Sequence, residues 1–229
     1  MVKLQFAVTD GGVYPTKKDE DAGYDIYADW GKEPSDSVVI MPGEIHMFHT
    51  SLYSVIDTDH WIQIAERGST GSKGMAVRAG VIDSGYRDEW LILINNTSDK
   101  PLIFVDPDKM DSLTRVEISK IIKESQNRKK RMAAIKAFNE LKNIDEITDE
   151  NIKMIREITC ELETNLVDRE EHLFPSYAKN QVTLVSKKKA ICQAVPRQNE
   201  AVDREEVDMT VIANAKSERG TGKLGSSGK

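Results

Sequence analysis

Asp83 and Tyr86 lie on either side of a Ser-Gly pair in the stretch AGVIDSGYRDEW, residues 79–90. Ser-Gly is typical of a turn, and a β-hairpin with its tip there would place the carboxylate and the ring across from each other. A carboxylate next to a polyphosphate can accept a proton from water and direct that water at phosphorus, which accelerates the reaction about 10²–10⁴-fold. In the alternative interpretation Asp83 only caps the turn, and this stretch alone leaves both open.

Two further segments carry groups that suit phosphate or metal. In ERGSTGSKG, residues 66–74, Arg67 and Ser69 follow an apolar strand pattern, and an arginine beside exposed N–H groups can hold phosphate oxygens. In DAGYDIYAD, residues 21–29, Asp25 can hold a metal ion or its water shell. The alternatives are a plain surface turn for the first segment and an ion pair between Asp25 and a nearby arginine for the second.

The sequence ends on RGTGKLGSSGK, residues 219–229, with four glycines, two serines and three cationic side chains. Backbone N–H groups freed by glycine, together with cations, suit polyphosphate. The segment from residue 216 is polar and Gly-rich, which predicts mobility in the absence of a ligand.

Short strands separated by turn residues must position these groups. Apolar β candidates occur at residues 4–8, 38–41, 45–50, 61–65, 75–79, 90–94 and 102–105, and again at 181–186, 190–195 and 207–212. Such spacing favours a sandwich, barrel or jelly roll, so we expect a mainly β fold.

Residues 111–172 differ in pattern because they contain neither glycine nor proline. Thr114 and Glu117 suit a capping box, and apolar residues follow at helical spacing, with a break at residues 143–146. We expect an antiparallel helical hairpin inserted into a β domain. The predicted division is therefore a β domain of residues 1–110 and 175–215, an inserted hairpin of residues 111–174, and a flexible arm of residues 216–229.

The composition narrows the class of protein. The chain has 229 residues, of which 39% are hydrophobic and 31% charged, and its net charge is −6. A negative balance disfavours a general nucleic-acid binder, and no apolar run approaches the ~18 residues that span a bilayer. We therefore expect no membrane partner and no nucleic-acid partner. Because Cys160 and Cys192 lie far apart in the sequence, we expect two free thiols in a reducing cytoplasm.

In their order, the segments DAGYDIYAD, RGSTGSKG, AGVIDSGYRDEW, AICQAVP and RGTGKLGSSGK resemble the five motifs of the homotrimeric deoxyuridine triphosphatases, or dUTPases. The resemblance covers residues 1–110 and 175–229 and leaves out the helical insertion. It implies a jelly-roll-like β barrel that hydrolyses dUTP to dUMP and pyrophosphate with Mg²⁺. It also implies a homotrimer that shares its active sites between subunits, in a bacterial cytoplasm or a phage-infected host.

The resemblance implies roles for individual residues. Asp83 would activate the water that attacks the α-phosphorus, Tyr86 would pack under the deoxyribose, and Asp25 would act on Mg²⁺ through its water shell. The backbone around Gly80, Val81 and Ile82 would contact the uracil edge. The expected phosphate contacts come from Arg67, Ser69 and Gln193, and the arm would close over the substrate through Arg219, Gly222, Leu224, Gly225 and Ser226.

Two other functions fit the same resemblance. A dCTP deaminase would share the fold, although the Asp83–Tyr86 stretch and the Gly-rich arm favour hydrolysis of the triphosphate. A regulatory protein could retain the dUTPase fold with little catalysis. For the insertion itself, one interpretation is a packing or trimer-supporting elaboration, and the other is a docking surface for a regulatory protein.

Overall fold

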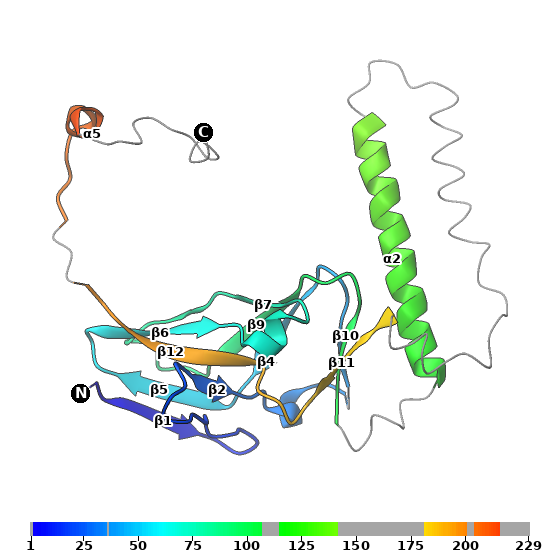
Figure 1. The fold of residues 1–229 in the computed structure, drawn as a ribbon, viewed down its shortest axis with the longest axis horizontal. Helices are drawn as coiled ribbons and strands as arrows, with labels where there is room; N and C mark the ends of the chain where they lie inside the picture. The colour runs from blue at the N-terminus through cyan, green and yellow to red at the C-terminus, as the bar shows by residue number, and fades with distance from the viewer. Residues whose placement is uncertain (1, 36, 107–114, 142–180, 201–203, 216–229) are drawn as a thin grey trace. The chain divides into compact units, whose positions relative to one another are not determined.

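The computed structural model of the chain describes residues 2–35, 37–106, 115–141, 181–200 and 204–215. Its contacts divide the chain into two units, Met1–Gln198 and Asn199–Lys229. The first unit holds every strand among the described residues (Figure 1). The mainly β, jelly-roll-like fold predicted from the sequence is confirmed.

The strands form four small sheets. β1 (Leu4–Val8) pairs with β5 (Leu52–Ile56), and β11 (Thr183–Ser186) lies beside β10 (Leu102–Val105), which pairs with β3 (Val38–Ile40). A third sheet has the order β4 (Ile45–His49), β9 (Leu91–Asn96), β7 (Met75–Arg78). The fourth has the order β2 (Tyr24–Ile26), β12 (Cys192–Gln198), β6 (His60–Ala65), β8 (Val81–Ile82).

The predicted strands are confirmed up to Gln198, and their ends differ from the prediction by at most three residues. The strands β2, β5 and β8 are additional, and two of them are only two or three residues long. Such short strands give too few alternating positions for a pattern to stand out.

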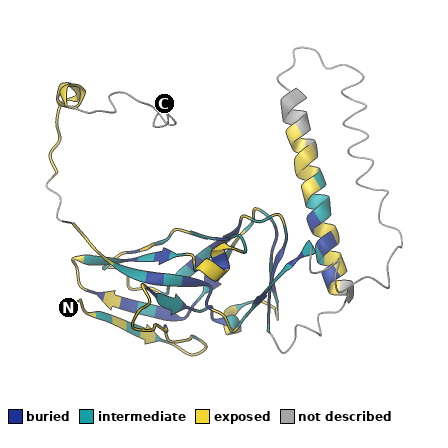
Figure 2. Cartoon of the chain, viewed as in Figure 1, coloured by how far each residue is buried: buried dark blue, intermediate teal, exposed yellow. Residues whose placement is uncertain are grey.

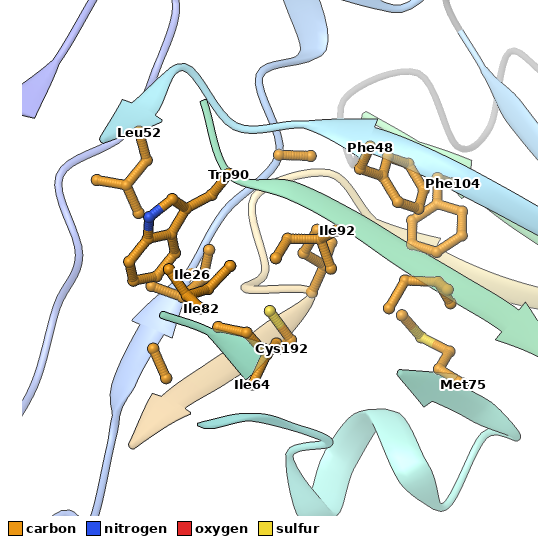
Figure 3. Close-up of a cluster of buried hydrophobic side chains, with 14 of the residues drawn as sticks. Ile26, Phe48, Leu52, Ile64, Met75, Ile82, Trp90, Ile92, Phe104 and Cys192 are labelled. Atoms are coloured by element: carbon orange, nitrogen blue, oxygen red, sulfur yellow. The ribbon is translucent and has the colours of Figure 1, made fainter. Parts of the chain in front are cut away.

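The inward-facing side chains of these sheets meet in one hydrophobic core. Trp90, Phe48 and Phe104 are fully buried, and Figure 3 shows them among the surrounding aliphatic side chains. Phe48 contacts Phe104 edge to face, with 5.0 Å between the ring centroids. Cys192 is a free thiol in this core, and burial raises its pKa, so the sulfur stays protonated and unreactive.

β10 and β11 run parallel, and this determines where the helical insertion lies. Parallel neighbours cannot be joined by a tight turn, because the chain must cross back over the sheet, usually through a helix. The helix α2 (Arg115–Leu141) lies within this connection. Ile118 and Ile122 of α2 pack against Ile103 of β10 and against Val182, so α2 covers the outer face of this sheet.

Only the first half of α2 packs in this way. Ser125 is still buried, but Met132 and Ile135 are 60% and 52% exposed, and Figure 2 shows the exposed residues along the far end of α2. The first predicted helix is therefore confirmed. The predicted break at residues 143–146 and the second helix of the hairpin lie outside the described residues.

The second unit contains the helix α5 (Met209–Asn214). The prediction of a strand at residues 207–212 is therefore wrong. Asp208 accepts a hydrogen bond from the Thr210 amide at 2.8 Å, which is an N-cap and starts a helix where the Val-rich pattern alone indicates a strand.

Two shorter helices, η1 (Trp30–Lys32) and α1 (Gly68–Gly71), complete the described elements. None of the helices in the described ranges combines the length and apolar character needed to pass through a membrane.

Candidate functional site

Four of the five predicted motifs meet on the sheet β2–β12–β6–β8. Asp25 lies in β2 and Gln193 in β12, Arg67 comes two residues after the end of β6, and Val81 and Ile82 form β8. Asp25 is directly opposite Gln193, and Gln193 is opposite Ala65, so three segments that are far apart in the sequence meet in one row. The sequence order of the motifs gives no indication of this row, because it depends on how the strands pair.

Arg67 and Asp25 form a two-pronged ion pair. Arg67 Nε lies 2.7 Å from Asp25 Oδ1, and Nη2 donates to Oδ2 at 2.9 Å. The guanidinium also donates from Nη1 to the Ala190 carbonyl at 3.5 Å. The ion pair predicted as the alternative role of Asp25 is thus present. A planar guanidinium held at two points has a fixed direction, which leaves its remaining N–H groups oriented for an anion.

The turn after Arg67 is held by a residue that sequence reasoning did not select. The buried Thr70 hydroxyl accepts a hydrogen bond from the Arg67 amide at 3.0 Å and lies 3.0 Å from the Arg67 carbonyl. A threonine three residues after a turn-starting residue is a signal that could have identified it. Ser69 lies in the same turn and is exposed. Gln193 Nε2 donates to the Glu66 carbonyl at 2.8 Å and ties β12 to this turn.

The stretch around Asp83 forms the expected turn but not the expected hairpin. The Tyr86 amide donates to the Asp83 carbonyl at 3.1 Å across Ser84 and Gly85, which is a β-turn. The strands on its two sides belong to different sheets, because β8 pairs with β6 and β9 pairs with β4 and β7. The prediction of a hairpin is therefore wrong, and the turn instead links two sheets.

Asp83 is exposed on this turn, and Tyr86 is 37% exposed. The Tyr86 hydroxyl donates to the Glu89 carbonyl at 2.9 Å. Burial, and then the neighbouring Asp88 and Glu89 carboxylates, raise the pKa of Tyr86, so the phenol stays protonated and keeps this hydrogen bond. The Tyr86 ring is thereby tied to the backbone at Glu89, the residue that anchors the end of this turn.

Glu89 anchors the end of this turn and is a second residue that sequence reasoning did not select. Its carboxylate accepts hydrogen bonds from the Thr50 and Ser51 amides at 3.1 and 2.7 Å and from Lys32 Nζ at 3.0 Å. Burial alone would raise the pKa of Glu89, but the Ser51 amide, His49 and Lys32 together lower it to about 2. Ser51 adopts a positive φ of 52°, which points its amide at this carboxylate.

The backbone at the start of β8 is closely fitted to β6. The Ile64 amide donates to the Gly80 carbonyl at 2.8 Å, and a Cβ on Gly80 would lie 2.7 Å from the Ile64 carbonyl oxygen. Only glycine allows this approach. Ile82 is buried, whereas Val81 is 57% exposed. Because β8 is the last strand of its sheet, half of its backbone groups face away from β6 and can hydrogen-bond a flat polar ligand.

Asp83 does not approach the Arg67–Asp25 pair within one chain. Ile62 is opposite Ile82, so Asp83 lies next to Trp61, whereas Asp25 is in the row of Ala65 and Gln193. With ~3.3 Å per residue along a strand and ~4.8 Å between strands, Asp83 lies roughly 20 Å from Asp25. The predicted site residues of one chain therefore form two separate groups.

The described residues hold no group of three or more His, Cys, Asp or Glu side chains that could bind a metal ion directly. The residues predicted in the arm, Arg219, Gly222, Leu224, Gly225 and Ser226, lie outside the described residues, as does Cys160.

Comparison with known proteins shows which family the chain resembles in sequence. The family model of the dUTPases matches residues 10–139. The Pol polyprotein of Ovine maedi visna related virus (strain South Africa) is 31% identical over 98 residues, which are 43% of this chain and 8% of that polyprotein. The Pol polyprotein of Caprine arthritis encephalitis virus (strain Cork) is 31% identical over 87 residues, 38% of this chain and 7% of the polyprotein. The chain thus spans less than a tenth of these curated relatives.

Solved phage structures are also similar. The Staphylococcus bacteriophage 80alpha dUTPase with dUPNHPP shows a TM-score of 0.52 and 20% identity, covering 99% of both chains. This likeness shows a shared fold. A dUTPase from phage phi11 of S. aureus, with a structural Mg(II) ion, is 26% identical with a TM-score of 0.37, covering 42% of this chain and 61% of that chain.

Proposed function

Since this chain belongs to the dUTPase family, we propose that it is a dUTP diphosphatase, which hydrolyses dUTP to dUMP and pyrophosphate. The observation that carries this proposal is the Arg67–Asp25 ion pair, in which Asp25 lies directly opposite Gln193 in the sheet. A fixed guanidinium at the end of a sheet, beside a Gly-Ser turn, suits a phosphate group. Phosphoryl transfer depends mainly on positioning and charge stabilisation, so such donors suffice without a protein nucleophile.

We assign the phosphate contacts to Arg67, Ser69 and Gln193. Two nitrogens of the Arg67 guanidinium already bind Asp25, so the group is oriented before the substrate arrives. The arginine side chain therefore loses less conformational freedom when the substrate binds. Ser69 is exposed in the turn that Thr70 holds, so its hydroxyl is accessible to a ligand. The exposed backbone edge of β8 is the proposed contact for the uracil ring.

Mg²⁺ fits this site only through its water shell. Both Asp25 oxygens bind Arg67, yet each carboxylate oxygen keeps a lone pair that can accept from a water molecule. Mg²⁺ usually keeps several waters and binds one or two carboxylates together with substrate phosphates. We therefore propose that Asp25 holds the water shell of a Mg²⁺ ion, which neutralises phosphate charge when bound.

Asp83 is the proposed base. Its exposure on a turn leaves the carboxylate free to accept a proton from a water molecule aimed at the α-phosphorus. Tyr86, held by its hydrogen bond to the Glu89 carbonyl, is the proposed support for the deoxyribose ring. The carboxylate that takes the proton and the guanidinium that holds the phosphates are thus on different parts of one chain.

This separation favours a shared active site. Roughly 20 Å between Asp83 and Asp25 is too far for both to act on one substrate. We propose that the chain forms a homotrimer, in which the Asp83 turn of one copy faces the Arg67 group of another. In the proposed division, residues 1–110 and 175–215 form the β domain, residues 111–174 form the insertion, and residues 216–229 form an arm that closes over the phosphates.

A regulatory role remains a second candidate for the insertion. The observation that favours it is the exposure of Met132 and Ile135 on α2, beyond the part that packs on the sheet. Large apolar side chains on one projecting helix suit the binding of another protein.

The decisive experiment compares Asp83→Asn with Asp88→Asn, an exposed aspartate five residues further along the same turn region. We expect Asp83→Asn to lower kcat for pyrophosphate release from dUTP with Mg²⁺ by about 10²–10⁴-fold, because the base is lost while the shape is kept. Asp88→Asn should change kcat by less than about threefold.

The same assay should include dCTP, dTTP and UTP, with ammonia measured beside pyrophosphate. Ammonia release from dCTP would identify a deaminase instead. Full dUTP turnover in Asp83→Asn would contradict the proposed base.

A further inference from the structure

Two lysines lie beside the turn that follows β6, and neither is among the site residues expected from the sequence. Lys73 is in the last part of this turn, where its amide donates to the Thr70 carbonyl at 3.0 Å. Lys189 directly precedes Ala190, whose carbonyl accepts a hydrogen bond from Arg67 at 3.5 Å. Both lysines are therefore on segments that meet at the Arg67 guanidinium.

The ammonium groups of these two lysines act on each other without a carboxylate to balance them. Lys73 is half-buried and Lys189 is exposed. Burial, and then the positive charge of Lys189, lower the pKa of Lys73. In the part of the chain that the structure describes, no hydrogen bond or ion pair holds either ammonium group.

The first lysine of the run at residues 187–189 has a partner, in contrast to Lys189. The Nζ atom of Lys187 lies 4.9 Å from the centroid of the Trp30 ring. The Trp30 indole N–H donates to the Lys187 carbonyl at 2.7 Å. Lys187 is thus fixed on the helix η1, so a general need for solvated charge does not explain the whole run.

Like charges that lie near each other without a counter-ion lower the stability of a fold. Such an arrangement is typical of functional sites, where the charge of a ligand offsets the repulsion. Lysine binds phosphate as a point charge, whereas Arg67 presents an oriented fork. A ligand that reaches Arg67 and both lysines has to carry more than one phosphate group.

We infer that Lys73 and Lys189 bind the terminal phosphates of the substrate and make the site selective for a triphosphate over a diphosphate. A diphosphate lacks the last phosphate group, so it gains less from these two charges. The same contacts hold the pyrophosphate product, which makes free pyrophosphate a ligand of this lysine pair. The inference rests on the proposed function, because it takes dUTP as the substrate.

The test removes one charge at a time from the full-length chain. Lys189→Gln and Lys187→Gln form a matched pair, because each removes one charge from the same run and only Lys187 has Trp30 as a partner. We expect Lys73→Gln and Lys189→Gln each to weaken the binding of inorganic pyrophosphate by about fivefold or more, and Lys187→Gln to leave it within about twofold. Isothermal titration calorimetry, with and without Mg²⁺, measures the dissociation constants.

Selectivity is measured by comparing a non-hydrolysable dUTP analogue with dUDP in the same titrations. We expect the preference for the triphosphate to fall in Lys73→Gln and Lys189→Gln by about the factor seen for pyrophosphate, and to persist in Lys187→Gln. Pyrophosphate binding as tight in the first two variants as in Lys187→Gln would overturn the inference, as would a wild type that does not bind pyrophosphate.

Thermal unfolding without ligand separates a ligand contact from a structural role. Removing a repulsive charge should leave the melting temperature of Lys73→Gln at or above that of the wild type. Lower melting temperatures in both Lys73→Gln and Lys189→Gln would give the lysines a structural role and overturn the inference.

Measuring dUTP hydrolysis by the wild type distinguishes this inference from the proposed function. Pyrophosphate binding that depends on both lysines, in a chain that does not hydrolyse dUTP, refutes only the function. Hydrolysis of dUTP by the wild type, with unaltered pyrophosphate binding in Lys73→Gln and Lys189→Gln, refutes only the lysine site.

Discussion

At the scale of single residues, an ion pair and a phosphate site are not competing roles for Arg67. Its contact with Asp25 uses two of the three guanidinium nitrogens and fixes the plane of the group. An arginine without such a partner would lose more side-chain freedom when it binds a phosphate group. The sequence alone presents these as alternatives because it does not show that the strand pairing brings Asp25 within reach of Arg67.

Glu89 gives the residue-scale prediction. Its pKa is lowered to about 2 from the 4.5 of an unperturbed group. A depressed carboxyl pKa stabilises the folded state above pH 4.5, and this stability is lost as the pH falls from 4.5 toward 2. Since Glu89 is 13% exposed, the shift corresponds to about 3 kcal/mol at neutral pH.

We expect Glu89→Gln to lower the free energy of unfolding at pH 7 by about this amount and to flatten its decline between pH 4.5 and 2. Urea unfolding at fixed protein concentration across that range measures both effects. The exposed Glu20→Gln serves as the control. A Glu89→Gln curve that parallels the wild type throughout would show that the carboxylate is not the anchor.

At the scale of elements, α2 has two roles: it lies in the connection between β10 and β11, and it covers the outer face of their sheet. The parallel pairing of β10 and β11 requires a long connection, and Ile118 and Ile122 bury the outer side of Ile103. These contacts support the packing interpretation for the first half of α2. They leave the exposed half, with Met132 and Ile135, as the part on which a regulatory role depends.

Two isoleucines of α2 provide a matched comparison. Ile122 is 6% exposed, whereas Ile135 is 52% exposed. We expect Ile122→Ala to lower the free energy of unfolding by about 2–4 kcal/mol, because it leaves a cavity against the sheet. Ile135→Ala should change it by less than about 0.5 kcal/mol, because about half of that side chain is already exposed. Denaturant unfolding measures both, and equal losses would mean that α2 is not anchored through Ile122.

At the scale of the whole molecule, the arm of residues 216–229 carries a clear sequence motif. It lies outside the residues that the structure describes. A Gly-rich cationic segment can remain free before binding and exclude water from the triphosphate afterwards. Removing residues 219–229 should leave a folded assembly that still binds dUTP but hydrolyses it on the order of 10²-fold more slowly.

Light scattering, binding of a non-hydrolysable dUTP analogue and pyrophosphate release test the three parts of this prediction. The full-length chain is the reference in all three. A truncated chain with undiminished turnover would show that the arm is not needed for catalysis, and one that no longer assembles would give it a structural role instead.

Local pattern was sufficient for much of the fold. The alternation of apolar residues predicts the strands up to Gln198 except β2, β5 and β8, and the absence of glycine and proline in residues 111–172 predicts α2. The pattern was misleading at residues 207–212, where the Asp208 cap favours a helix over an apolar run that indicates a strand. It was also misleading at the Asp83 turn, since the residues of a tight turn do not specify which strands pair beyond it.

The sequence by itself determined the types of reactive groups, their order along the chain and the short strands that carry them, because turn chemistry and side-chain alternation are local. Only the tertiary structure decided that Asp25, Gln193 and Arg67 share one end of a sheet, and that Asp83 does not join them. The physical reason is that strand pairing between distant segments depends on which faces can be buried together. No local spacing encodes that choice, and here it separates the proposed base from the proposed phosphate site.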